Sequence, residues 1–175
     1  SERDPSVPVR LAELMKEAGL PDGLLNVVHG DKEMVDAILD HPDIAAVSFV
    51  GSSDIAQYIY ARGTANGKRV QAFGGAKNHG IVMPDAELDQ VVNDLAGAAF
   101  GSAGERCMAL PVVVPFGKKT ADEVREGVLA ELETLKVGVS TDAAAQYGPV
   151  VSQAHKDKVS GYIQMGVDEG AELVV

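Results

Sequence analysis

The 175-residue sequence contains one cysteine and no tryptophan, and only 5% of its residues are aromatic. A lone cysteine cannot form an internal disulfide, and unpaired thiols are typical of reducing compartments. We therefore expect a cytoplasmic protein, or a protein of the mitochondrial matrix if the source is eukaryotic. The scarcity of aromatic rings argues against a surface on which nucleic-acid bases stack.

Positive charge and long apolar runs are also scarce. The sequence has 15 lysines and arginines against 26 aspartates and glutamates, a net charge of -11, which disfavours binding to nucleic acid and to anionic membranes. No apolar run approaches the roughly 18 residues of a membrane span, and the polar N-terminal residues are not those of a signal peptide. We therefore predict no nucleic-acid partner and no membrane partner. The four histidines lack the spacing of metal ligands, so we also predict no metal site.

Apolar periodicity indicates alternating helices and strands. We expect helices over residues 9–18, 30–39, 55–62, 87–100, 120–134 and 153–169, and strands over 24–28, 44–50, 69–73, 79–83, 110–115 and 171–175. This alternation predicts an α/β fold with crossover connections and a mostly parallel sheet. The run of β-branched residues at 44–50 predicts a strand buried on both faces. Because the chain lacks an initial methionine and stops inside a strand-like pattern, we expect a piece of a longer protein.

The single cysteine, Cys107, ends the run GSAGERC (residues 101–107). Glycines let a backbone approach a ligand closely, and the adjacent Arg106 favours the thiolate form of the sulfur. These features indicate a nucleophile, although many lone cysteines are small buried core residues. Arg106 could hold a substrate carboxylate through paired N–H bonds, or it could form an ion pair with Glu105 or another nearby acid.

Two further turns combine glycine with ends of predicted strands. Residues 49–52, FVGS, follow a strand and open a helix, which is a common place for a pyrophosphate, although Ser52 or Ser53 could simply cap that helix. The usual GxGxxG dinucleotide fingerprint is absent. Gly74 and Gly75 separate two strands, either as an ordinary turn or as a backbone that passes close to a flat ligand ring.

In this order and spacing, FVGS (49–52), FGG (73–75) and GERC (104–107) resemble the aldehyde dehydrogenase superfamily. Within it, GGAKNH (74–79) and GSAGERCMA (101–109) resemble the CoA-acylating methylmalonate-semialdehyde dehydrogenases. The resemblance covers essentially the whole chain. It implies part of a Rossmann-type NAD-binding domain at residues 1–70 and part of the α/β catalytic, thiol-nucleophile domain at residues 71–175, together about a third of such an enzyme.

The resemblance also implies roles for individual residues. Cys107 matches the nucleophile, and Arg106 matches an arginine that stabilises the substrate carboxylate. The residues that match cofactor-binding positions are Glu2 and Arg3 for the adenosine side of NAD, Ser52 for the phosphates and Gly74 for the nicotinamide.

The implied reaction is NAD-dependent oxidation of malonate or methylmalonate semialdehyde, a step of valine catabolism. A cysteine thioester passes to CoA as acetyl-CoA or propionyl-CoA, with loss of carbon dioxide. Ala72 stands where hydrolytic members carry a glutamate base, which favours CoA over water. The alternatives are a hydrolytic NAD-dependent aldehyde dehydrogenase and a truncated, non-catalytic fragment. We expect the full-length protein to form a homo-oligomer and the isolated fragment to be inactive.

Overall fold

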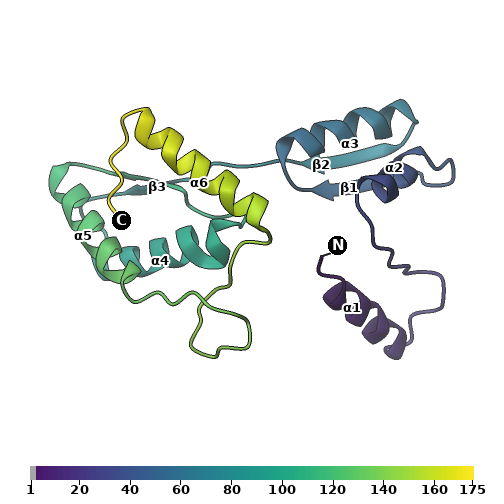
Figure 1. Ribbon diagram of the computed structural model, residues 1–175, viewed down its shortest axis with the longest axis horizontal. Coiled ribbons are helices and arrows are strands. Elements are labelled where there is room, and N and C mark those ends of the chain that lie inside the picture. Colours follow the sequence, from purple (N-terminus) through teal and green to yellow (C-terminus); the bar gives the residue numbers. More distant parts are fainter. Residues whose placement is uncertain (1–2) are drawn as a thin grey trace. The chain divides into compact units, whose positions relative to one another are not determined.

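The computed structural model describes residues 3–175, and the chain forms two compact units that divide between Gly75 and Ala76. Each unit contains one pair of parallel strands with helices packed against it (Figure 1). The division falls after Gly75 rather than at residue 70, because the strand Arg69–Phe73 pairs with an earlier strand of the first unit. No helix in the described part of the chain has the length and apolar character needed to cross a membrane.

The first unit is a βαβ arrangement preceded by two helices. Its elements are α1 (Ser6–Glu17), α2 (Lys32–Asp40), β1 (Ala46–Val50), α3 (Ser53–Ala65) and β2 (Arg69–Phe73). Strands β1 and β2 are parallel, with Ala46 opposite Arg69 and Val50 opposite Phe73, and α3 is the crossover between them. The α2 helix begins where the side chain of Asp31 accepts a hydrogen bond from the Glu33 N–H, which satisfies a free donor of the first turn.

The core of the first unit lies between α2, α3 and the strands. Leu39 and Ile59 are the largest fully buried side chains among the described residues. The buried Lys68 donates hydrogen bonds from Nζ to the carbonyl oxygens of His41 at 2.5 Å and Ile44 at 2.7 Å. These bonds compensate its loss of hydration and hold the segment that enters β1.

The second unit repeats the βαβ arrangement and adds two helices. Its elements are β3 (His79–Val82), α4 (Leu88–Phe100), the 3-10 turn η1 (Gly101–Gly104), β4 (Val112–Pro115), α5 (Lys118–Leu132) and α6 (Gln153–Asp168). Strands β3 and β4 are parallel, with His79 opposite Val112. Val82, Leu95 and Val124 form the buried cluster that joins β3, α4 and α5.

These elements confirm the α/β fold class, the six expected helices and four of the six expected strands. The strands expected at 24–28 and 171–175 were wrong, because neither segment pairs with another strand among the described residues. The expectation that residues 44–50 are buried on both faces was also wrong. Exposed and half-buried residues alternate along β1, since α3 covers one face and the described residues leave the other uncovered.

Candidate active site

Cys107 lies at the tip of a tight turn in the second unit. The turn spans Arg106 to Ala109, and the Ala109 N–H donates to the Arg106 carbonyl oxygen at 3.1 Å. Cys107 is free and exposed, and the next residue, Met108, is 81% exposed. Ala109 is buried and anchors the turn at its far end. Among the described residues, Cys107 is therefore an exposed residue of a turn and not a buried core cysteine.

The backbone before the turn is strained. Ser102 and Ala103 adopt left-handed conformations with φ of 56° and 54°, which cost non-glycine residues about 1–3 kcal/mol each. The following Glu105 side chain contacts His155 of α6, Oε1 to Nε2. His155 is itself placed at the start of α6, where its N–H donates to Ser152 Oγ at 3.2 Å. The segment that leads into the nucleophile is thus held by a residue far along the chain.

A second long-range contact reaches the turn from the start of β3. Asn78 Nδ2 donates to the carbonyl oxygens of Cys107 and Ala109, both at 2.9 Å. We did not assign a role to Asn78 from the sequence, although it stands in the GGAKNH run. The signal that could have found it is the parallel pairing of β3 with β4, because the residues just before each strand then lie close together.

Arg106 lies folded back onto the end of α4. Its Nη1 is 3.5 Å from the Gly97 carbonyl oxygen, and its guanidinium group lies against Gly101. A Cβ at Gly101 would be 2.7 Å from Arg106 Nη1 and 2.8 Å from Cζ, so only glycine leaves room for this arrangement. The Glu105 side chain contacts His155, and the proposed ion pair between Glu105 and Arg106 is not among the contacts of these two described residues. Arg106 is exposed to solvent.

In the first unit, Ser52 lies just beyond the end of β1, and Gly74 lies just beyond the end of its parallel neighbour β2. Ser52 is the N-cap residue of α3 but makes no side-chain capping hydrogen bond. Ser53 Oγ instead accepts the Gly75 N–H at 3.0 Å. The first-turn N–H groups of α3 therefore donate no hydrogen bond to the Ser52 side chain. Such an end suits a phosphate group.

Gly74 is required by packing inside the protein. A Cβ at this position would be 2.8 Å from Ser53 Oγ and 3.0 Å from Ser53 Cα. Gly74 also borders a cavity of about 350 Å³, whose other lining residues are Ser53, Ala56, Gln57, Tyr60 and Ala72. None of these lining residues carries a carboxylate. From the sequence, we expected the Gly74 backbone to pass close to a ligand ring. The structure shows that this backbone also lies close to Ser53, the first residue of α3.

The structure says little about the two residues predicted for the adenosine side of NAD. Arg3 lies exposed in the segment before α1, and Glu2 lies outside the described residues. In the first unit, Gly74 thus lies against Ser53, the residue after Ser52, and in the second unit Arg106 and Cys107 share one turn. Within residues 3–175, no three histidine, cysteine or acidic side chains gather in a metal-binding arrangement.

Comparisons with known proteins agree on one family. Residues 1–175 match the model of the aldehyde dehydrogenase family. The malonate-semialdehyde dehydrogenase of Pseudomonas aeruginosa is 57% identical over 175 residues, which are 100% of this chain and 35% of that protein. The chain therefore spans about a third of the length of this relative.

Two solved structures are similar to this chain in both sequence and backbone. A protein from Sinorhizobium meliloti 1021, provisionally described as a methylmalonate-semialdehyde dehydrogenase and solved with NAD, is 59% identical with a TM-score of 0.95. The methylmalonate-semialdehyde dehydrogenase of Oceanimonas doudoroffii is 56% identical, also with a TM-score of 0.95. Each comparison covers 100% of this chain and 36% of the solved chain.

Proposed function

Because the chain belongs to the aldehyde dehydrogenase family, we propose that it supplies the nucleophile and part of the NAD site of an enzyme that oxidises malonate or methylmalonate semialdehyde. The observation that carries the proposal is the exposed thiol of Cys107 at the tip of a braced turn. The relatives named for malonate or methylmalonate semialdehyde, at 56–59% identity, support the substrate class.

The Cys107 sulfur forms a bond to the aldehyde carbon, and the carbonyl oxygen becomes an oxyanion. The backbone N–H of Cys107 donates to that oxyanion. NAD, when bound, accepts the hydride that leaves the same carbon. What remains on Cys107 is a thioester, and the proton of the thiol passes to solvent.

The first unit offers features that fit NAD. The α3 N-terminus lacks a side-chain capping bond from Ser52, so its N–H groups suit the cofactor phosphates. The adjoining cavity of about 350 Å³ borders Gly74, where we propose that the nicotinamide passes. Arg3 and Glu2 are proposed for the adenosine side on the strength of the sequence resemblance alone.

Arg106 and Ala72 support the finer substrate assignment. Arg106 is exposed, and those guanidinium donors that do not face the Gly97 carbonyl oxygen can form charge-assisted hydrogen bonds with the carboxylate of a semialdehyde. Ala72 cannot activate water, and no residue lining its cavity is acidic. A CoA thiol ionises far more readily than water and needs less help. We therefore propose that CoA takes the acyl group, with loss of the substrate carboxylate as carbon dioxide, in a full-length protein that forms a homo-oligomer.

The proposal is tested first at the nucleophile. In the full-length protein, Cys107→Ser should lower NADH production at least about a thousandfold, because a serine hydroxyl is a far weaker nucleophile than a thiol. Met108→Leu changes the other exposed residue of the turn tip and is the matched control, with kcat within about twofold of the unmodified protein. A Cys107→Ser variant that keeps a wild-type kcat would show that the nucleophile lies elsewhere.

The second test separates CoA from water. Ala72→Glu places a carboxylate in the cavity and should raise the yield of free acid relative to acyl-CoA, because general-base assistance contributes about 100- to 10,000-fold. Ala72→Gln has the same size without the base and should leave the product ratio unchanged. If the unmodified protein forms mainly free acid with CoA in excess, the hydrolytic alternative replaces the acylating one.

A further inference from the structure

We propose that Asn78 is a positioning residue, which fixes the backbone of the Cys107 turn and thereby the direction of the nucleophilic sulfur. This inference rests on the proposed role of Cys107. It is carried by two hydrogen bonds, from Asn78 Nδ2 to the carbonyl oxygens of Cys107 and Ala109, each 2.9 Å long.

The two bonds use the full donor capacity of the amide. A side-chain NH₂ group has two hydrogens, and distances of 2.9 Å are normal for N–H···O bonds. The accepting carbonyls lie on either side of Met108, so one rigid side chain joins the tip of the turn to its buried end. The carbonyl of Cys107 belongs to the residue that carries the thiol, and holding it limits rotation of the peptide plane next to the sulfur.

The rest of the turn does not supply this restraint. Its closing bond runs from the Ala109 N–H to the Arg106 carbonyl oxygen at 3.1 Å, and the next anchor runs from the Leu110 N–H to the Ala98 carbonyl oxygen at 3.3 Å. Neither involves the Cys107 carbonyl. Cys107 and Met108 are exposed, so no packing by the described residues holds the tip either. Asn78 is thus the side chain that restrains the nucleophile's own peptide group.

The position and the residue type both fit this role. Asn78 directly precedes β3, whose first residue, His79, lies opposite Val112 of β4, so its side chain reaches the turn that leads into β4. Asn78 is half-buried. Aspartate has nearly the same shape but no donor when ionised, and its carboxylate would face two carbonyl oxygens.

The test compares Asn78→Asp and Asn78→Ala in the full-length protein. Misplacing a reacting group by about 1 Å costs on the order of 100-fold in rate, so both variants should lower kcat about 10- to 100-fold. The KM for NAD should stay close to that of the unmodified protein, because neither bond involves the residues proposed to bind NAD. The thermal midpoint should fall by no more than a few degrees, since only one of the two accepting residues, Ala109, is buried. Asn26→Asp is the matched control, since Asn26 Nδ2 also donates to a backbone carbonyl, that of Gly23, at 2.9 Å. Its kcat should not change.

Each outcome decides. A kcat within about twofold of the unmodified protein in Asn78→Ala overturns the inference, and so does a loss of kcat that comes with an equal loss of NAD binding and of thermal stability. If Asn78→Asp does not fold, Asn78→Ala decides by the same criteria. Cys107→Ser distinguishes a failure of the proposed function from a failure of this inference. If Cys107→Ser stays active, the proposed function is wrong. If Cys107→Ser is inactive and Asn78→Ala is fully active, only the role of Asn78 is refuted.

Discussion

At the scale of single residues, Gly101 controls where Arg106 lies. The φ of Gly101 is −55°, which any residue can adopt, so alanine is compatible with the backbone there. A Cβ would nevertheless lie 2.7 Å from Arg106 Nη1 and would displace the guanidinium. Gly101→Ala should therefore raise the KM for a carboxylate-bearing semialdehyde about 10- to 100-fold, the range expected for a lost hydrogen bond to a charged group. Steady-state kinetics with the semialdehyde measure it.

Two comparisons distinguish this change in KM from a general disturbance of the fold. Gly97→Ala lies on α4, which ends just before Gly101, and an added Cβ there meets nothing within 4 Å. The contact of Arg106 with the Gly97 carbonyl oxygen therefore stays, and that KM should not change. For Gly101→Ala itself, the KM for an uncharged aldehyde such as propanal should also stay the same. A rise of equal size for both substrates would mean that Arg106 does not recognise the carboxylate.

The residue scale also shows how much of the candidate site the sequence could predict. Cys107 and Arg106 stand side by side in a recognisable run, and the structure indeed places them in one exposed turn. The role of Asn78 was not predictable in the same way, because it depends on which strands pair and in what register. Gly101 was noticed for its flexibility, but its use is to leave space for a side chain five positions later.

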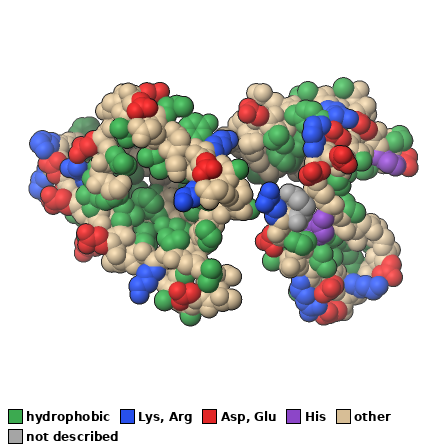
Figure 2. Space-filling view, in the orientation of Figure 1, with side chains coloured by type: hydrophobic (Ala, Val, Ile, Leu, Met, Phe, Trp, Pro, Cys, Tyr) green, Lys and Arg blue, Asp and Glu red, His purple; other side chains and the backbone are tan. Residues whose placement is uncertain are grey.

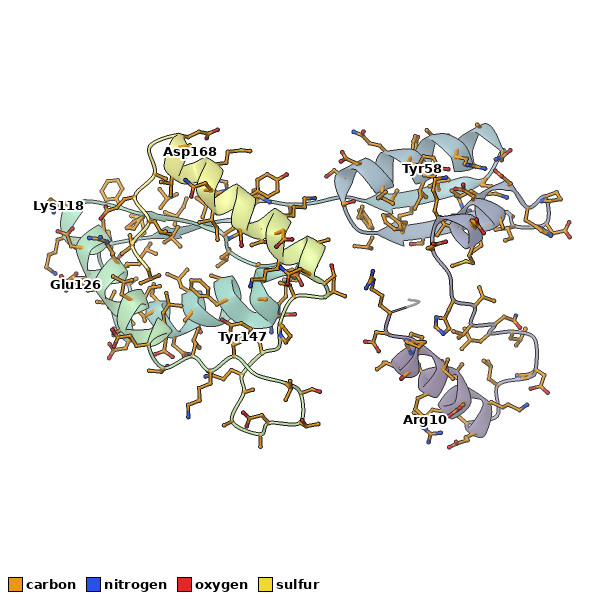
Figure 3. The ribbon with its side chains drawn as sticks, in the orientation of Figure 1. Arg10, Tyr58, Lys118, Glu126, Tyr147 and Asp168 are labelled. Carbon is orange, nitrogen blue, oxygen red and sulfur yellow. The ribbon has the colours of Figure 1, made fainter. Side chains whose placement is uncertain are left out.

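At the scale of elements, a charged network joins α2 to α3 in the first unit. Arg62 lies 3.0 Å from Asp36 and 2.5 Å from Asp40, and the Tyr58 hydroxyl, labelled in Figure 3, donates to Asp36 at 2.6 Å. Hydrogen bonds from Lys32 and then from Tyr58 lower the pKa of Asp36 below its ordinary value of 3.8. A hydrogen bond from Arg62 does the same for the pKa of Asp40.

These lowered pKa values predict how the stability depends on pH. A carboxyl group whose pKa is lower in the folded state stabilises the fold at pH values above its unfolded pKa, and this contribution is lost as the pH falls through the folded pKa. Arg62→Met should therefore lower the thermal midpoint by a few degrees at about pH 7, and the difference from the unmodified protein should shrink below about pH 3.8. Circular dichroism melts across this pH range measure it.

The matched control is Arg10→Met on α1. Arg10 also lies between two acids, Glu13 at 2.9 Å and Glu17 at 3.1 Å, but on an exposed surface where ion pairs contribute little. Its midpoint should match that of the unmodified protein at every pH. A constant difference for Arg62→Met down to the lowest pH would show that the network does not act through these carboxylates.

Elements also differ in how well the sequence predicts them. The expected strand 69–73 coincides with β2, because a βαβ unit gives it a partner and a crossover helix. Residues 24–28 and 171–175 have similar apolar composition but no partner strand among the described residues. After α6, the side chain of Arg125 donates to Glu172 at 3.2 Å, and both side chains are exposed. Composition alone cannot tell a paired strand from an apolar loop.

At the scale of the whole molecule, the chain leaves more surface exposed than its size explains. Its accessible surface is 12804 Å², whereas a globular protein of this mass exposes about 8,100 Å², and two separate units of half the mass expose about 9,800 Å² together. Figure 2 shows apolar side chains at the surface of both units. Among them, Ile81 is 72% exposed on β3 and Val50 is 65% exposed on β1.

This exposed apolar surface predicts the behaviour of the 175-residue chain expressed by itself. Contiguous exposed apolar patches larger than a few hundred Å² promote association, so the chain alone should bind the dye ANS strongly and elute from gel filtration as species larger than a monomer. It should form no measurable NADH, because the units expose surfaces that a working enzyme of this family has to cover. The full-length protein, measured beside it, should bind little ANS. A monomeric chain that binds no more ANS than the full-length protein, or that turns over at about the 10 per second of a median enzyme, would contradict this prediction.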